Sequence, residues 1–156
     1  MSFEFENITE HTGVKIYNFD TSNDIKKEDL KKIKKLMQDR HFICFKNQNL
    51  NEDSLIKFSK NFGNLESYPE KNKTKKNIQI FNVANVSADG EHLNENDPRV
   101  VLQKNNSRWH TDSSYRFYPA LYSLLFGKET LPMEAIGGQT QFSNMLLAYQ
   151  RLPNDV

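Results

Sequence analysis

The interpretation of this chain begins at residues 109–115, Trp109-His110-Thr111-Asp112-Ser113-Ser114-Tyr115. Side chains two residues apart on an extended strand point to the same face, so His110 and Asp112 would present a ring nitrogen and a carboxylate oxygen to one point. These are two of the three ligands of the 2-His-1-carboxylate triad that binds non-heme Fe(II). Trp109 and Thr111 favour a strand. Because a His-x-Asp spacing alone is a weak signal, its meaning depends on the rest of the sequence.

The composition describes a globular chain with little net charge. The 156 residues carry a formal charge of +1, with 37% hydrophobic and 12% aromatic residues. This length is enough for one domain, the aromatic content argues against disorder, and the charge gives no case for nucleic acid or a membrane surface as partner. The single cysteine, Cys44, excludes an intramolecular disulfide and fits a reducing compartment, so we expect a cytoplasmic protein with a buried thiol.

Hydrophobic periodicity and capping residues predict helices first and strands later, which is an α+β pattern. We expect helices from Asn51 to Gly63 and after Asn144, because both asparagines are good N-caps. His41 and His92 are expected to be structural and exposed, respectively, while Trp109 and Tyr115 should pack in the core. The remaining expected elements are a lysine-faced helix over 25–40, strands over 14–17, 41–46, 78–83, 100–102, 109–115, 120–126 and 140–142, and polar loops over 71–76 and 84–99.

Several stretches outside residues 109–115 occur in an order that is typical of one family. They are Ile43–Gln48, Phe58–Gly63, Phe81–Gly90, Pro119–Leu125, Gly137–Phe142 and Leu152–Pro153. The ordered set resembles the TauD/TfdA family of Fe(II)/2-oxoglutarate-dependent dioxygenases, and within it the aryloxyalkanoate and taurine dioxygenases. The resemblance implies a double-stranded β-helix, a cupin-like jelly roll, with helices near the N-terminus.

The same resemblance implies roles for four residues. His110 and Asp112 match the first two iron ligands, and Thr140 matches a threonine that donates its hydroxyl to a 2-oxoglutarate carboxylate. Asn106 matches an asparagine that faces the substrate. From the residues alone, Thr140 could equally follow a plain turn at Gly137-Gly138, and a register slip of one residue would turn Asn106 to the other face.

The family's distal histidine and 2-oxoglutarate-binding arginine find no match. No histidine follows His110, and the only later arginines are Arg116 and Arg151. We therefore expect residues 1–156 to be the N-terminal portion of a single dioxygenase domain, truncated before the C-terminal part of the jelly roll. Such a portion should be marginal or oligomeric alone, because apolar residues such as Leu121, Leu125 and Phe142 would lack part of their covering layer.

By resemblance, the complete enzyme would use Fe(II), with 2-oxoglutarate and O₂ as cosubstrates. It would hydroxylate a small anionic organic molecule, a carboxylate or sulfonate, and release succinate; the 156-residue chain alone would be inactive. The alternative is an inert fragment or pseudo-enzyme that serves as a binding module. A zinc hydrolase ranks last, because His110 and Asp112 lack a third ligand. The oligomeric state, including a homo-oligomer, is left open.

Overall fold

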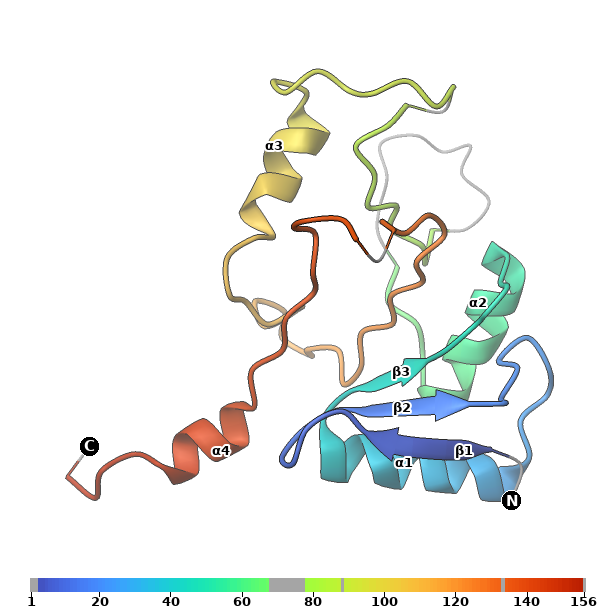
Figure 1. Cartoon of the computed structure of the whole chain (residues 1–156), viewed down its shortest axis with the longest axis vertical. Helices are drawn as coiled ribbons and strands as arrows, with labels where there is room; N and C mark the ends of the chain where they lie inside the picture. Colours follow the sequence, from blue (N-terminus) through green and yellow to red (C-terminus); the bar gives the residue numbers. More distant parts are fainter. Residues whose placement is uncertain (1–2, 68–77, 88, 133, 156) are drawn as a thin grey trace. The chain divides into compact units, whose positions relative to one another are not determined.

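The structure, a computed structural model, describes residues 3–67, 78–87, 89–132 and 134–155. It divides into two compact units (Figure 1). The first unit comprises Met1–Asn61 and Phe126–Val156, and the second comprises Phe62–Leu125. The predicted loop over 71–76 lies outside the described residues.

The first unit contains a three-stranded sheet of order β1-β2-β3. Strand β1 (Glu4–Asn7) pairs antiparallel with β2 (Val14–Tyr17), and β2 pairs parallel with β3 (Ile43–Phe45). A parallel pair needs a crossover connection, and helix α1 (Lys27–Arg40) supplies it. Strands over 14–17 and 41–46 and a helix over 25–40 were predicted and are confirmed with slightly different ends, whereas β1 was missed.

The core of the first unit lies between the sheet and α1. Val14 and Ile16 are two residues apart on β2, so their side chains point to the same face of the sheet, and both are buried. Ile33 is the buried residue of α1, and it marks the face that the helix turns inward. The helix lies along one side of the strands (Figure 1). Cys44, expected to be buried, is half-buried and free.

Helix α2 (Glu52–Ser59) begins where the sequence predicts. The Asn51 side-chain oxygen accepts a hydrogen bond from the Ser54 amide at 2.8 Å, and the Ser54 hydroxyl accepts one from the Asn51 amide at 2.9 Å. This reciprocal pair is a capping box, with serine in place of the usual Glu or Gln. A 3₁₀ turn, Lys60–Phe62, extends the helix to Gly63.

The end of α1 meets the β1–β2 turn. His41 closes the helix in a left-handed conformation (φ 70°), and its amide donates to the Met37 carbonyl at 2.9 Å. The His41 ring lies near the Thr12 hydroxyl, with Nδ1 3.4 Å from Oγ1, which fits the structural role expected for this side chain. Gly13, also left-handed (φ 79°), donates from its amide to the Arg40 carbonyl at 2.7 Å. A Cβ on Gly13 would come within 2.4 Å of Cζ of Phe42.

Helix α3 (Pro98–Asn105), in the second unit, corrects one prediction. We predicted a loop to residue 99 and a strand over 100–102, taking Pro98 as a break. Instead, the Asp97 carboxylate accepts from the Arg99 amide at 2.9 Å, and Pro98 occupies the first helical turn. Proline is favoured there because its missing N–H has no helical partner in any case.

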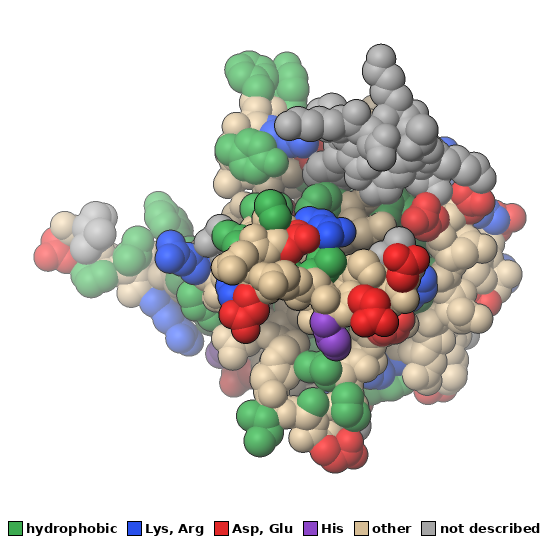
Figure 2. Space-filling model, turned by 90° about the horizontal axis from the view of Figure 1, so that it is seen from above, with side chains coloured by type: hydrophobic (Ala, Val, Ile, Leu, Met, Phe, Trp, Pro, Cys, Tyr) green, Lys and Arg blue, Asp and Glu red, His purple; other side chains and the backbone are tan. Residues whose placement is uncertain are grey.

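The predicted strands over 78–83, 109–115, 120–126 and 140–142 are wrong for this structure, which gives these segments no regular secondary structure among the described residues. A strand exists only where a neighbour completes its hydrogen-bond ladder. The apolar side chains in these segments are correspondingly open: Leu121 is 80% exposed, Leu125 76% and Phe142 56%. Figure 2 shows apolar side chains on the molecular surface in that view.

Helix α4 (Met145–Gln150) begins at the predicted cap in the first unit. The Asn144 side chain accepts from the Leu147 amide at 2.9 Å. Its apolar residues Met145, Leu146 and Tyr149 are exposed. The mixture of helices and one three-stranded sheet agrees with the predicted α+β class. Within the described residues, no helix has both the length and the apolar character that a membrane span requires.

Candidate iron-ligand pair

His110 and Asp112 meet through their side chains. Nε2 of His110 lies 3.4 Å from Oδ1 of Asp112, and each side chain is about half exposed. The two donor atoms lie close together, but His110 lies in an irregular segment and Asp112 at the start of a turn, so the strand on which this approach was predicted is not observed. Their role as iron ligands stays a prediction.

A backbone contact sets the chemistry of His110. Its Nδ1 lies 2.7 Å from the carbonyl oxygen of Arg108. Because a carbonyl only accepts, Nδ1 carries the proton in this contact. With the proton on Nδ1, the lone pair of Nε2 would be available to a metal ion beside Asp112.

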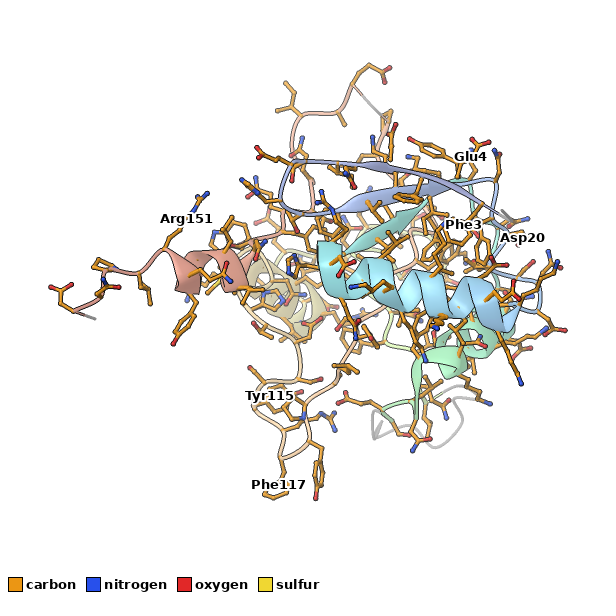
Figure 3. All side chains as sticks on the ribbon, turned by 90° about the horizontal axis from the view of Figure 1, so that it is seen from below. Phe3, Glu4, Asp20, Tyr115, Phe117 and Arg151 are labelled. Carbon is orange, nitrogen blue, oxygen red and sulfur yellow. The ribbon has the colours of Figure 1, made fainter. Side chains whose placement is uncertain are left out.

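The residues after Asp112 form a tight turn. Ser113 is buried and left-handed (φ 55°), and its carbonyl accepts from the Arg116 amide at 3.0 Å. Tyr115 is 82% exposed and projects from the loop beside Phe117 (Figure 3). Trp109 is 68% exposed. The expectation that Trp109 and Tyr115 pack in the core is therefore wrong, since the loop that carries them has no layer over it among the described residues.

The sequence analysis missed Glu66. Its carboxylate accepts a hydrogen bond from the Ser113 hydroxyl at 3.1 Å and lies 3.5 Å from Nε of Arg116. Glu66 is 47 residues from Ser113 along the chain, and no periodicity or spacing links the two. The only local signal is that a carboxylate follows the Phe62-Gly63 helix end.

The other two predicted site residues lie elsewhere. Asn106 ends α3 and is exposed, with its amide donating to the Gln103 carbonyl at 2.9 Å. Thr140 is exposed in the first unit. It follows Gly137 and Gly138, which are both left-handed (φ 93° and 72°), a backbone path that glycine allows. Contact of Thr140 with 2-oxoglutarate and of Asn106 with substrate stay predictions.

The donor atoms of His110 and Asp112 are of the types found in two of the three protein ligands of a non-heme iron site. A neutral imidazole and a carboxylate are the ligand types that non-heme Fe(II) uses. Among the described residues, no group of three or more His, Cys, Asp or Glu side chains could hold a metal ion. In residue type, His110 and Asp112 fit two of the three protein ligands of such a site.

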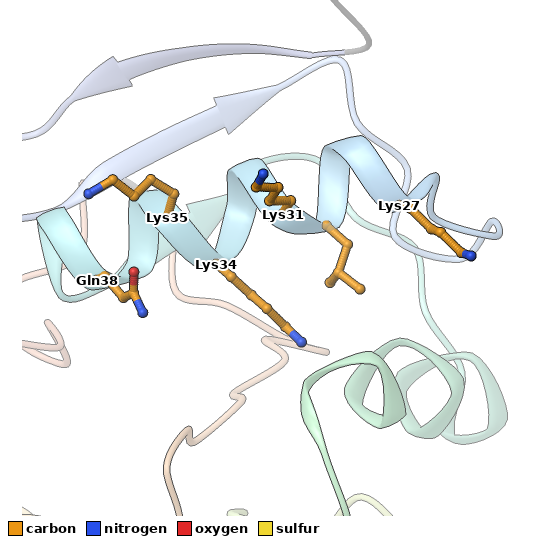
Figure 4. A pocket seen from close by; sticks show the side chains of 6 residues that line it. Lys27, Lys31, Lys34, Lys35 and Gln38 are labelled. Carbon is orange, nitrogen blue, oxygen red and sulfur yellow. The ribbon is translucent and has the colours of Figure 1, made fainter.

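A hollow of about 590 Å³ runs along α1 (Figure 4). It contains none of the predicted site residues. Lys35, one of its residues, pairs with Asp39 one turn further on at 2.7 Å. The arrangement fits the prediction that the lysine run forms a solvated face. The lining residues are Lys27, Leu30, Lys31, Lys34, Lys35 and Gln38.

Comparison with known proteins identifies the family. The family model for "Taurine catabolism dioxygenase TauD, TfdA family" matches residues 4–156. The chain therefore belongs to the TauD/TfdA family. It is 33% identical over 132 residues to the alpha-ketoglutarate-dependent 2,4-dichlorophenoxyacetate dioxygenase of Cupriavidus pinatubonensis, covering 82% of this chain and 45% of that enzyme. It is 31% identical to the (S)-phenoxypropionate/alpha-ketoglutarate-dioxygenase of Sphingobium herbicidovorans, covering 73% and 36%.

Solved structures agree on the fold. A Burkholderia xenovorans protein assigned as an alpha-ketoglutarate dependent 2,4-D dioxygenase superposes with a TM-score of 0.67 at 24% identity, over 99% of this chain and 48% of that one. AAD-2, crystallised with Mn(II) and N-oxalylglycine, superposes with a TM-score of 0.65 at 21% identity, over 77% and 40%. The chain thus spans less than half the length of each relative that it matches here.

Proposed function

We propose that this chain is the part of an Fe(II)- and 2-oxoglutarate-dependent dioxygenase that supplies two iron ligands, His110 and Asp112. The observation that carries the proposal is the 3.4 Å approach of Nε2 of His110 to Oδ1 of Asp112. The contact of Nδ1 with the Arg108 carbonyl supports it, because it leaves Nε2 free to bind a metal. Membership of the TauD/TfdA family supports the identity of the metal and cosubstrate.

In this reaction the chain's own residues would bind and orient the metal ion, 2-oxoglutarate and the substrate. His110, through the Nε2 lone pair, and the Asp112 carboxylate would hold Fe(II), and the carboxylate would offset part of the metal's charge. The Thr140 hydroxyl donates to a 2-oxoglutarate carboxylate, and Asn106 contacts substrate. When bound, Fe(II) supplies the reaction of O₂ with 2-oxoglutarate, in which one oxygen atom enters succinate, CO₂ is released, and the other becomes a hydroxyl group on a substrate carbon.

The substrate that we propose is a small anionic organic molecule, a carboxylate or a sulfonate. Two relatives bear the names of 2,4-dichlorophenoxyacetate and (S)-phenoxypropionate enzymes, and both named compounds are small carboxylates. The near-zero net charge gives no support for nucleic acid or membrane partners. The lone cysteine, Cys44, supports a cytoplasmic location, and homo-oligomerisation is left to measurement.

We also propose that residues 1–156 form the N-terminal part of one jelly-roll domain, in which the segments 109–115, 120–126 and 140–142 become strands once they are paired. Two observations support this. Leu121 and Phe142 lie exposed in such segments, and the relatives are more than twice as long as the matched part. Light scattering should show the 156-residue chain self-associating. A chain that stays monomeric and monodisperse would contradict the proposal.

A metal titration tests the ligand assignment. Under anaerobic conditions, one Fe(II) ion should bind per chain. His110→Ala or Asp112→Ala should weaken this binding by roughly tenfold or more, because even the loss of a residue that only hydrogen-bonds to a metal ligand typically lowers metal affinity that much. His92→Ala is the matched control, because His92 is an exposed histidine of the same unit. Equal binding by all four proteins would refute the assignment.

The second candidate function is a non-catalytic binding module. The observation in its favour is the lack of a three-ligand cluster among the described residues. The titration separates the two candidates, because a binding module without a metal site would take up no Fe(II), whereas the iron-ligand chain binds it weakly through His110 and Asp112. The same chain should bind 2-oxoglutarate more tightly once Fe(II) is present if the dioxygenase proposal is right.

A further inference from the structure

Glu66 anchors the loop that carries Asp112. Ser113, the residue after the proposed ligand, is only 9% exposed, and its hydroxyl donates to Oε2 of Glu66 at 3.1 Å. Nε of Arg116 lies 3.5 Å from the same oxygen. The Glu66 side chain is 23% exposed and that of Arg116 33%. One carboxylate therefore contacts both ends of the Ser113–Arg116 turn, which directly follows Asp112.

The backbone of this turn needs such an anchor. Ser113 has φ 55°, a left-handed conformation that serine rarely adopts, and such a conformation persists only where the surroundings hold it. The Arg116 amide closes the turn on the Ser113 carbonyl at 3.0 Å. Because Ser113 directly follows Asp112, its dihedral angles help to set where the Asp112 carboxylate points.

The Glu66 carboxylate contacts Ser113 and Arg116, and neither of these residues is a proposed iron ligand. Its Oε2 has the Arg116 guanidinium and the Ser113 hydroxyl as neighbours, while its Oε1 is buried and has no hydrogen-bond partner among the described residues. The Glu66 side chain is half-buried, so its position depends on these few partners. Glu66 is therefore held on the turn by two contacts that fix residues 113 and 116.

We propose that Glu66 is a positioning residue, which holds the 112–116 turn so that the Asp112 carboxylate stays beside Nε2 of His110. This inference rests on the proposed function, since it treats Asp112 as an iron ligand. Residues that hydrogen-bond around a metal site orient its ligands, and their loss typically lowers metal affinity by about 10–100-fold. Here the link to the ligand runs through the Ser113 backbone.

The test separates positioning from folding by two substitutions. Ser113→Gly removes the hydroxyl but suits a left-handed backbone, and Glu66→Gln removes the charge that faces Arg116. Glu91→Gln is the matched control, because Glu91 is an exposed glutamate of the same unit. The readouts on the full chain are Co(II) affinity, the Co(II) visible absorption spectrum and the thermal unfolding midpoint.

We expect Ser113→Gly and Glu66→Gln to bind Co(II) about tenfold or more weakly with an altered spectrum, whereas Glu91→Gln behaves as wild type. Ser113→Gly should bind Co(II) more weakly and yet keep the wild-type unfolding midpoint. If the contact were purely structural, the loss of binding would come with a lower midpoint. Wild-type affinity and spectrum in both variants would overturn the proposal, and the Ser113 variant keeps the test valid if Glu66→Gln fails to fold.

Amide hydrogen exchange distinguishes failure of this inference from failure of the proposed function. If the wild-type chain takes up no Co(II), the ligand assignment fails. In the metal-free chain, the Arg116 amide should still exchange faster in Glu66→Gln and Ser113→Gly than in wild type if Glu66 holds the turn. Unchanged exchange at Arg116 in both variants would overturn the positioning role whatever the metal result.

Discussion

Replacing Ile33 by alanine should lower the free energy of unfolding of the first unit by about 2–5 kcal/mol. Ile33 is 1% exposed on α1, and the other fully buried large side chains, Val14 and Ile16, are on β2. The substitution removes Cγ1, Cγ2 and Cδ1, and each buried carbon contributes about 0.8 kcal/mol by transfer alone. The cavity left behind adds to that loss. Because a whole domain is stable by only about 5–15 kcal/mol, this single change removes a large share.

Urea unfolding followed by far-UV circular dichroism measures the loss. The matched control is Ile136→Ala, which makes the same chemical change on a residue of the same unit that is 103% exposed. Exposed substitutions of this kind usually stay within about 0.5 kcal/mol of wild type. If Ile33→Ala costs no more than Ile136→Ala, α1 does not pack on the sheet as described, and the reasoning from burial to stability is wrong.

Three further predictions concern a cap, a carboxylate and the chain's activity. Asn51→Ala should cost about 1 kcal/mol of unfolding free energy, because the Ser54 amide loses its acceptor, and Asn51→Ser should restore most of it in urea melts. Hydrogen bonds from Arg99 lower the pKa of Asp97 from 3.8 to about 2. The ionised Asp97 cap thus stabilises α3 fully above about pH 4, and this stabilisation is lost as the pH falls through 2. An NMR titration of the Asp97 carboxyl, with circular dichroism of the helix, would follow the loss. A titration midpoint near 3.8 would contradict the lowered pKa. With Fe(II), 2-oxoglutarate and ascorbate, the 156-residue chain should release little or no succinate, because two protein ligands hold iron weakly; robust release coupled to a substrate would show that a third ligand comes from elsewhere.

Helix ends could be predicted from the sequence because a cap is a local event. Asn51 and Asn144 each precede an apolar helix and each accept from an amide three residues on, so the spacing contains the whole interaction. Asp97 follows the same rule with Arg99, two residues on. It was missed because Pro98 was interpreted as a break, although proline is equally at home in the first turn of a helix.

Strands and the contacts around the candidate site depend on residues that are distant along the chain, and the local sequence does not show which residues these are. Alternating apolar residues show that a segment suits a pleated surface, but its hydrogen bonds require another strand, and residues 120–126 have none among the described residues. The His110–Asp112 contact joins residues only two positions apart, although the strand from which it was predicted is not observed. The contact of Glu66 with Ser113 could not be predicted, since it joins positions 47 residues apart.

Gly13 gives the first unit a requirement of handedness. An L-residue there would suffer twice, from its left-handed backbone and from overlap with the Phe42 ring, which itself stacks on Phe142 with ring centroids 4.1 Å apart. A D-residue prefers positive φ and carries its Cβ where the L-residue has its Hα. In a chain made by chemical synthesis, D-alanine at position 13 should thus relieve the backbone cost that L-alanine incurs. The mirror-image pair would measure how much of glycine's role at this junction is conformation and how much is space.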